Sequence, residues 1–274
     1  MVTQEQRKRQ LAREKFLRQQ QRRTSARRKA RVRNSVIASV LGVILVGSVA
    51  LYTTNAFKKD DDKSNANANA EASPSASPSK APDPCEKAAA GSVKKLSWKK
   101  EPAMSIDKSA DYTMKLATTC GDIDIALKTS AAPHTVNSFD FLAGKGYFDH
   151  TKCHRLTTNG IYVLQCGDPT ASGSGGPGYT IPDENLKDKS LKGNVYPAGT
   201  IAMANTGQAH TGGSQFFLVY QDSQLPPSYT PFGTVSASGM KVLKKIAAAG
   251  ENTGAGDGAP NATVVIDKAT VVKS

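Results

Sequence analysis

Two short segments of the chain alternate strictly between apolar and polar side chains. Residues 112–117 and 122–127 each place an apolar side chain at every second position. This period of two is typical of a half-buried β-strand. Thr119, Cys120 and Gly121 lie between the segments and can form a turn. The pattern therefore predicts an antiparallel β-hairpin whose apolar face carries Tyr112, Met114, Leu116, Ile123, Ile125 and Leu127.

After the hairpin the pattern changes to helices and short strands. A helix is predicted from about Pro133 to Leu142, because Pro133 suits a first helical turn and Gly144 or Gly146 suits a helix end. A second helix is predicted at about 238–248, before Gly250. Short apolar runs predict further strands at residues 153–157, 161–166, 199–204, 215–220, 230–236 and 263–272. Eight strands, two helices and long irregular loops indicate a mainly-β fold, a closed eight-stranded antiparallel barrel with two flanking helices.

The longest apolar stretch lies near the N-terminus, outside this pattern of strands. Residues 35–57 form a run of 23 residues without a charge. A helix of that length reaches roughly 34 Å, enough to cross the hydrocarbon core of a bilayer. We therefore expect a single transmembrane helix in front of the barrel. A cleaved signal peptide is the alternative, although the preceding basic region is unusually long and no clean Ala-x-Ala cleavage site follows.

Charge is unevenly spread along the chain. The net charge is +13, and residues 1–34 alone hold 13 Lys and Arg against 2 acids. Because Lys and Arg are enriched on the cytoplasmic side of a membrane span, we expect a cytoplasmic tail and a domain outside the cell membrane. The tail is either a basic helix on anionic lipid or a solvated, partly helical segment. Residues 84–274 carry a net charge of only +3, so we expect no nucleic acid partner.

Composition completes the division of the chain. Residues 58–83 are of low complexity, with Asn-Ala and Ser-Pro repeats, and they cannot bury apolar surface. We expect four parts in order: a basic cytoplasmic tail (1–34), a transmembrane helix (35–57), a low-complexity tether that leads into the domain (58–110), and a folded domain (111–274).

The chemistry lies in three short stretches of the predicted domain. The first runs Cys153-His154-Arg155-Leu156 and continues at Val163-Leu164-Gln165-Cys166-Gly167-Asp168. The others are Ala202-Met203-Ala204-Asn205 and Gly212-Gly213-Ser214-Gln215-Phe216-Phe217. In this order and spacing, and followed by Tyr229-x-x-Phe232-Gly233, they resemble the cyclophilins, a family of peptidyl-prolyl cis/trans isomerases, or rotamases. The resemblance covers about residues 111–272.

The resemblance implies a site that stabilises a twisted prolyl amide. Amide resonance sets a rotation barrier of about 18–20 kcal/mol, and crossing it requires no proton transfer and no covalent bond. A catalyst has to bind the twisted amide better than either planar form. Twisting localises the lone pair on the proline nitrogen, so a fixed hydrogen-bond donor beside that nitrogen favours the twisted state. By family position Arg155, whose guanidinium is permanently charged and rigidly forked, is the catalytic residue.

The same resemblance implies an apolar cup for the proline ring and polar groups that hold the peptide. The cup is expected from Val163, Phe217 and Leu225, with Tyr162 and Tyr229 on its rim. Phe216 is expected in the core. Gln165, Asn205 and Gln215 match the family's polar residues, and Ala204 and Asn205 are expected to offer backbone groups to the peptide.

The sequence departs from the family pattern in three places. The loop at residues 157–160 is longer than usual, so either Ile161 or Tyr162 takes the family's Phe position, and counting back from Gln165 selects Tyr162. Tyr229 stands where many members carry His. Leu225 stands where many carry Trp, which implies weak binding of cyclosporin-type ligands.

The four cysteines are Cys85, Cys120, Cys153 and Cys166. An even number in an oxidising compartment favours at least one disulfide inside the domain, but the pairing cannot be deduced. Cys153 with Cys166 is one possibility, and we expect Cys85 to be the one left free because its neighbours resemble the tether. The four histidines show no metal-ligand spacing, and we expect neither a metal nor a cofactor.

These observations predict a membrane-anchored prolyl isomerase that assists the folding of exported proteins and acts on Pro-containing polypeptides. The alternative is a cyclophilin-like module that binds Pro-containing partners without catalysis. The presence of Arg155, Gln165 and Phe217 together favours the enzyme, since degenerate family members tend to lose such residues.

Overall fold

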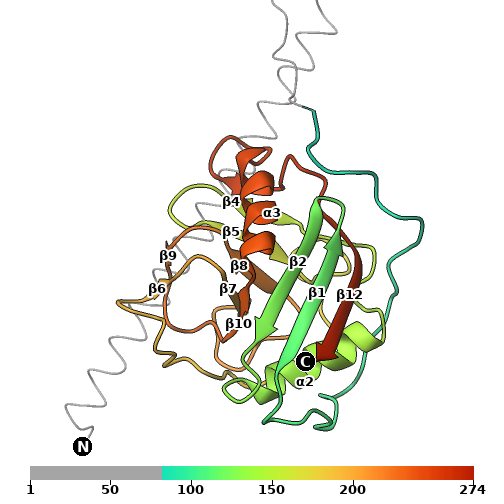
Figure 1. The fold of residues 1–274 in the computed structure, drawn as a ribbon, viewed down its shortest axis with the longest axis vertical. Helices are drawn as coiled ribbons and strands as arrows, with labels where there is room; N and C mark the ends of the chain where they lie inside the picture. Colours follow the sequence, from blue (N-terminus) through green and yellow to red (C-terminus); the bar gives the residue numbers. More distant parts are fainter. Residues whose placement is uncertain (1–81) are drawn as a thin grey trace, which may run out of the picture. The chain divides into compact units, whose positions relative to one another are not determined.

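The computed structural model describes residues 82–274, which form a mainly-β domain with two α-helices (Figure 1). The tail predicted at 1–34, the transmembrane helix predicted at 35–57 and most of the tether lie outside the described residues. Within residues 82–274, neither helix has the length and apolar character that a membrane span needs. The predicted fold class included such a span, and the described residues contain none.

The main sheet also differs from the predicted closed barrel of eight strands. Ten strands pair in the order β11-β4-β5-β8-β7-β10-β2-β1-β12-β3, and every pair is antiparallel. The sheet curls, but its two outer strands, β3 (Thr151–Lys152) and β11 (Asp257–Gly258), do not pair with each other. Each is two residues long, too short for a period-two pattern in the sequence. The remaining strands of this sheet are β1 (Tyr112–Thr118), β2 (Gly121–Leu127), β4 (Arg155–Thr157), β5 (Val163–Cys166), β7 (Thr200–Met203), β8 (Phe216–Val219), β10 (Pro231–Val235) and β12 (Val265–Lys273).

The predicted hairpin is confirmed as β1 and β2. The two strands pair in register, with Met114 opposite Ile125 and Leu116 opposite Ile123. All four side chains are at most 1% exposed, so the apolar face of the hairpin is part of the core. A second, two-stranded sheet joins β6 (Val195–Tyr196) to β9 (Ser223–Gln224), and the sequence pattern gave no sign of it.

Both predicted helices are confirmed. Helix α2 (Pro133–Gly144) has Pro133 in its first turn, and helix α3 (Ala237–Ala248) starts at Ser236, whose hydroxyl accepts the Gly239 N–H at 3.1 Å. Helix α3 packs against β2 and α2 packs near β12, so each helix covers part of the curled sheet (Figure 1). An aromatic cluster fills the centre of the core, where Phe139 of α2 contacts Phe148, Phe216 and Phe232. The expectation that Phe216 is a core residue is therefore confirmed.

Residues 82–106, which we call the N-terminal strap, contain no helix or strand and yet lie against the domain. The Glu86 N–H donates to the Thr119 carbonyl at 2.7 Å, and the Ala89 N–H donates to the Asp267 carboxylate at 3.0 Å. At its other end, the Ser105 N–H donates to the Asn137 side chain of α2 at 2.8 Å. The strap therefore crosses from the β1–β2 turn to α2 along one side of the domain.

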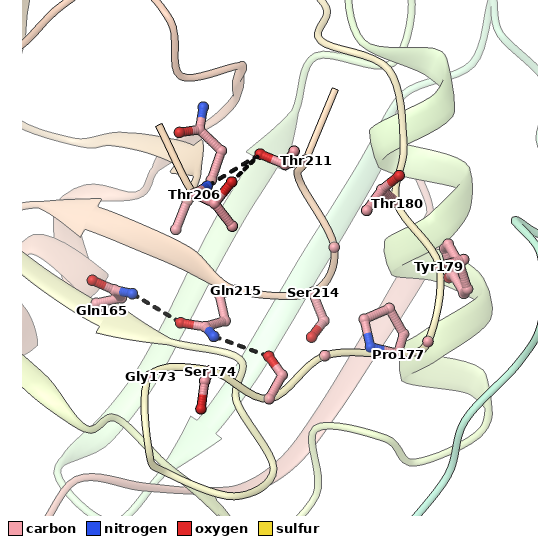
Figure 2. Close-up of a pocket in the computed structure, with 16 residues that line it drawn as sticks. Gln165, Gly173, Ser174, Pro177, Tyr179, Thr180, Thr206, Thr211, Ser214 and Gln215 are labelled. Carbon is pink, nitrogen blue, oxygen red and sulfur yellow. Dashed lines mark hydrogen bonds between the residues drawn. The ribbon is translucent and has the colours of Figure 1, made fainter. Parts of the chain in front are cut away.

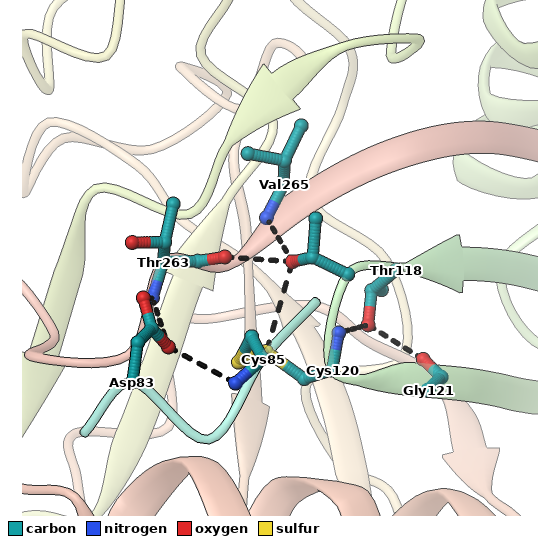
Figure 3. Close-up of a disulfide and its surroundings, with 8 residues drawn as sticks. Asp83, Cys85, Thr118, Cys120, Gly121, Thr263 and Val265 are labelled. Carbon is teal, nitrogen blue, oxygen red and sulfur yellow. Dashed lines mark hydrogen bonds between the residues drawn. A yellow bond between two sulfur atoms is a disulfide. The ribbon is translucent and has the colours of Figure 1, made fainter. Parts of the chain in front are cut away.

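Two disulfides close loops in the domain, one of 35 and one of 13 residues. The second joins Cys153 to Cys166, the pair that the sequence offered as a possibility. The first joins Cys85 to Cys120, so the expectation that Cys85 is free is wrong. The reason is local: the Asp83 carboxylate accepts the N–H groups of both Cys85 and Thr263, which turns the start of the strap onto the β1–β2 turn (Figure 3).

The two disulfides should contribute unequally to stability. In the chain-entropy account, a crosslink stabilises by restricting the unfolded chain, and the restriction grows with the length of the loop. For loops of 35 and 13 residues the difference amounts to about 1 kcal/mol. The double variant Cys85→Ala/Cys120→Ala is therefore expected to lose about 1 kcal/mol more free energy of unfolding than Cys153→Ala/Cys166→Ala. Denaturant unfolding of the two variants measures this difference, and an equal or reversed loss would contradict the prediction.

Candidate functional site

The register of three neighbouring strands brings the predicted site residues together. Arg155 on β4 lies directly opposite Gln165 on β5, as expected for a hairpin of these segments. Gln165 in turn lies opposite Phe217 on β8. Directly opposite residues in an antiparallel sheet point to the same face, so the cation, the amide and the aromatic ring form one row across the sheet.

A chain of hydrogen bonds holds the polar members of this row. The Arg155 Nε and Nη2 atoms each donate to one oxygen of Asp257 on β11, both at 2.7 Å. Arg155 Nη1 donates to Gln165 Oε1 at 3.2 Å, and Gln165 Nε2 donates to Gln215 Oε1 at 2.9 Å. Gln215 Nε2 then donates to the Gly175 carbonyl at 2.9 Å (Figure 2). Three nitrogens of the guanidinium are therefore engaged, and its orientation is fixed from two sides.

The ion pair sets the charge state of both partners. Its hydrogen bond to Asp257 raises the pKa of Arg155, and the hydrogen bond from Arg155 lowers the pKa of Asp257. Both groups are consequently charged at neutral pH. Burial lowers the pKa of the neighbouring His154, whose two ring nitrogens are buried and have no hydrogen-bond partner. Arg155 is also the only arginine among residues 82–274, where the other 18 basic residues are lysines.

A small pocket of about 160 Å³ is lined by Arg155, Gln165 and seven further residues, most of them apolar. It is close in volume to engineered apolar cavities of about 150 Å³ that hold one benzene ring. Of the described residues, those that line it include no Cys, Ser, Thr, Lys or His. Apart from Arg155 and Gln165, the lining residues are Ile161, Val163, Ala204, Asn205, Phe217, Leu225 and Tyr229.

The walls of this smaller pocket belong to a small hydrophobic cluster separate from the main core. Phe217 and Tyr229 meet edge to face, with their ring centroids 5.4 Å apart. Behind them Tyr196 of β6 is fully buried, and its hydroxyl donates to the Tyr229 carbonyl at 2.8 Å and accepts the Tyr229 N–H at 3.2 Å. Tyr196, which the sequence did not single out, thus fixes the loop that carries Tyr229.

A wider pocket of about 490 Å³ adjoins the smaller one (Figure 2). Gln165, Ala204, Asn205 and the strand-end residue Gln215 line it, and a loop at residues 173–180 forms a further wall. In Figure 2, Thr206 and Thr211 lie on one side, Gly173 and Ser174 on the other, and Gln215 between them. Gln165, Ala204 and Asn205 line both pockets, so a single extended ligand can occupy the two together.

Asp168 anchors the start of the wall loop. Its carboxylate is buried and accepts the N–H groups of Thr170, Ser172, Gly173 and Gly175 at 2.7–3.1 Å. Burial acts to raise the pKa of Asp168, but the hydrogen bond from the Thr170 hydroxyl, together with those from the backbone, lowers it to about 2. The charge therefore persists at neutral pH and holds the loop by its backbone.

Some of the sequence-predicted residues lie elsewhere or are already engaged. Tyr162 does not line the smaller pocket, because its ring faces the main core and meets Tyr220 edge to face at 5.9 Å. Ile161 lines the pocket instead. The Ala204 N–H donates to the Gln215 carbonyl at 2.9 Å, and the Asn205 side chain donates to the Ser228 carbonyl at 2.8 Å. The backbone donor of Ala204 and the amide of Asn205 thus shape the pocket rim.

Sequence reasoning missed Asp257 and the wall loop, and it preferred Tyr162 to Ile161. Asp257 lies 102 residues beyond Arg155 in a Gly-rich loop without periodicity, so no pattern linked the two. Ile161 carried a usable signal, because residues 161, 163 and 165 share one face of a strand while residue 162 points to the other. The wall loop is rich in Gly and Ser, which indicates a loop but not the pocket that it borders.

The arrangement can bind an apolar ring and an extended chain, and it places a fixed cation at the edge of the ring's pocket. Cys153 cannot act as a nucleophile, because it is bound in a disulfide. Among the described residues, no group of three or more His, Cys, Asp or Glu is placed to hold a metal ion.

Comparisons with known proteins find a family model and curated relatives that match this domain. A family model described as cyclophilin type peptidyl-prolyl cis-trans isomerase/CLD matches residues 113–271. A probable peptidyl-prolyl cis-trans isomerase B of Mycobacterium leprae is 51% identical over 166 residues, which cover 58% of this chain and 56% of that protein. A Mycobacterium tuberculosis protein of the same description is 47% identical over 165 residues and is covered to 53%. The matched part of the chain thus spans little more than half the length of these relatives.

The fold has a counterpart among solved structures. A crystal structure of a Cryptosporidium parvum cyclophilin type peptidyl-prolyl cis-trans isomerase is similar, with a TM-score of 0.50 and 26% sequence identity. The similarity covers 60% of this chain and 99% of that one.

Proposed function

This chain belongs to the cyclophilin-type peptidyl-prolyl cis-trans isomerase family, and from that membership we propose that it catalyses the cis/trans isomerisation of X-Pro peptide bonds. The observation that carries the proposal is the position of Arg155, a fixed cation beside an apolar pocket large enough for one ring. X-Pro is also the only kind of peptide bond for which both isomers are readily accessible.

The proposed mechanism is non-covalent. The proline ring enters the smaller pocket against Phe217 and Val163, which fixes one side of the amide bond. The other side rotates, and the proline nitrogen becomes pyramidal and basic as resonance is lost. An N–H of Arg155 donates to that nitrogen and stabilises the twisted state more than either planar state. Neither a proton transfer nor a nucleophile is needed.

The polar row supplies the orientation that this mechanism requires. Asp257 binds the edge of the guanidinium formed by Nε and Nη2, and Gln165 binds Nη1. A mobile Arg side chain has about 2 kcal/mol of rotamer entropy to lose when it is fixed. Arg155 is already held by Asp257 and Gln165, so it loses less conformational freedom than a mobile side chain when the substrate binds. Asp257 is therefore a positioning residue in this proposal.

We propose exported proteins as the substrates and the space outside the cytoplasm as the place of action. The two disulfides support this, because such bonds persist in oxidising compartments and are rare in the cytosol. A non-catalytic module that binds Pro-containing partners would use the same pockets, and the activity of the Arg155 variant distinguishes it from the enzyme.

Replacing Arg155 should abolish most of the activity without unfolding the domain. We expect Arg155→Ala to lower kcat/KM for a prolyl peptide by about tenfold or more, a loss of about 1.4 kcal/mol for each factor of ten. NMR exchange spectroscopy on the cis and trans peptide resonances measures the rate, and the Tm reports on folding. Lys152→Ala, which removes an exposed cation on β3, is the matched control and should retain wild-type activity. Full activity of Arg155→Ala would exclude the assigned role, and an inactive wild type would favour the binding module.

Replacing Asp257 tests the positioning role. Asp257→Asn keeps the shape but removes the charge, and we expect kcat to fall about three- to tenfold with KM unchanged, roughly the strength of one charged hydrogen bond. The Tm should hardly change, because exposed ion pairs contribute about 0–1 kcal/mol to stability. Asp257→Glu should recover part of the loss, and Asp111→Asn, an exposed carboxylate before β1, should have no effect. A faster Asp257→Asn enzyme would mean that the carboxylate holds Arg155 away from the substrate.

The pH profile tests the absence of acid–base chemistry. The pKa of Arg155 is raised and that of Asp257 is lowered, so both charges persist across the neutral range. The lowered pKa of His154 keeps that ring neutral there. We therefore expect kcat/KM to be constant from about pH 7 to about pH 9. Asp257 is ionised above its unfolded pKa, so the pair should be lost only as the pH falls through the lowered folded value, below about pH 4. A bell-shaped profile within the neutral range would contradict this mechanism.

A further inference from the structure

The N-terminal strap touches the outer side of the loop that forms a wall of the wider pocket. The Trp98 N–H donates to the Pro177 carbonyl at 2.8 Å, and Pro177 lines that pocket. The next pocket residue, Gly178, lies so close to the strap that a Cβ on it would collide with the Ser97 hydroxyl and the Trp98 carbonyl. Gly178 also has a φ of +87°, which a side chain rarely adopts. Strap and wall loop are therefore packed backbone to backbone.

The Trp98 side chain ties this contact to the rest of the pocket. Its ring meets Phe141 of α2 edge to face at 5.0 Å and packs against Tyr147 at 6.0 Å. The Tyr147 hydroxyl is hydrogen-bonded to the Ser214 hydroxyl at 3.0 Å, and Ser214 lines the wider pocket beside Gln215. Trp98 thus contacts the wall loop through its backbone, and its ring is linked to a second pocket residue, Ser214, through Tyr147.

The wall loop is confined from its other side as well. A Cβ on Gly213, a pocket residue, would lie 3.1 Å from Pro177 Cδ, and the Tyr179 hydroxyl is hydrogen-bonded to Ser138 of α2 at 2.8 Å. The loop therefore lies between the strap and the body of the domain. A shift of the strap has to be transmitted to the pocket, because close-packed neighbours do not compress.

The strap itself is held firmly enough to act as a support. The Cys85–Cys120 disulfide fixes its start. Gly91 passes so close to the His150 ring that a Cβ there would overlap it. Beyond Trp98, Glu101 pairs with His134 of α2 at 2.7 Å. All of these residues except Cys120, His134 and His150 precede residue 113, where the match to the family model begins.

We propose that Trp98 is a specificity-determining residue, which positions the wall loop at 173–180 and thereby sets how tightly the wider pocket holds the part of a substrate that extends beyond the X-Pro dipeptide. The proposal rests on the proposed function, since it concerns the same site. The ligand of the wider pocket is an extended polypeptide, because that pocket is continuous with the proline pocket and is bordered by backbone and small polar side chains. Arg155 and the smaller pocket do not touch the strap and act on short and long substrates alike.

The test compares a short and a long peptide around the same X-Pro bond. The short one is a capped X-Pro dipeptide amide, and the long one carries additional residues on both sides. NMR exchange spectroscopy gives kcat and KM, and NMR titration gives the Kd of each peptide. Trp98→Ala keeps the backbone N–H and removes the ring that packs on Phe141 and Tyr147. We expect KM and Kd for the long peptide to rise about three- to tenfold, the effect of losing an aromatic contact, with kcat unchanged. Both values for the short peptide should remain at the wild-type level.

Two further variants separate this role from a general loss of stability. Leu96→Ala removes another strap side chain that packs on the core. It should lower the Tm while leaving unchanged the ratio of the Kd for the long peptide to the Kd for the short one. Gly178→Ala pushes the loop off the strap from the other side and should reproduce the effect of Trp98→Ala. If Trp98→Ala does not fold, Gly178→Ala tests the proposal on its own.

The outcomes are distinct. A wild-type Kd ratio in Trp98→Ala or in Gly178→Ala would overturn the proposal, as would an equal change of the ratio in Leu96→Ala. Because the Kd values do not depend on turnover, a wild-type protein without isomerase activity would refute the proposed function while the role of Trp98 could still be read from binding.

Discussion

A guanidinium that is to meet a rotating amide has to be immobile and still reach the substrate, and much of the described structure meets this requirement. Arg155 is engaged by Asp257 and by Gln165, on the strands to either side of it. Gln165 is held by Gln215, and Gln215 by the backbone of the wall loop. The Cys153–Cys166 disulfide closes the open end of the β4–β5 hairpin, so it also protects the register that puts Arg155 opposite Gln165. A slip of one residue would turn Arg155 to the other face of the sheet.

The sequence allowed the elements with clear periodicity and the residues within the three motifs to be predicted. The β1–β2 hairpin, both helices and the facing of Arg155 and Gln165 follow from local patterns. Closure of the barrel could not be judged, because the outer strands β3 and β11 are two residues each and depend on tertiary pairing. Tyr162 was preferred over Ile161 by counting residues, whereas the alternation of side chains along a strand would have selected Ile161. The ion pair of Asp257 and the disulfide of Cys85 could not be predicted, because the partners are distant in the sequence and the neighbouring residues resemble a loop or a tether.

The N-terminal strap shows how a segment without regular structure becomes part of a domain. Its sequence lacks the spacing of a helix or a strand, yet a disulfide, several backbone hydrogen bonds and the apolar side chains of Leu96, Trp98 and Ile106 place it against the core. The buried polar side chain of Asn137 on α2 explains its far end: it accepts the Ser105 N–H and donates to the carbonyls of Pro102 and Ala103. The buried amide of Asn137 is tolerated on this helix because the backbone of the irregular strap supplies its hydrogen-bond partners.

Trp98 is the only tryptophan in the chain. Its indole ring packs against Phe141 and Tyr147 next to the wall of the wider pocket. The intrinsic fluorescence of the whole protein, excited at the red edge where tyrosine does not absorb, therefore originates from one place. The protein carries an optical reporter at the junction of strap and pocket, and the local environment there can be followed in real time, on the unlabelled chain, while a peptide binds.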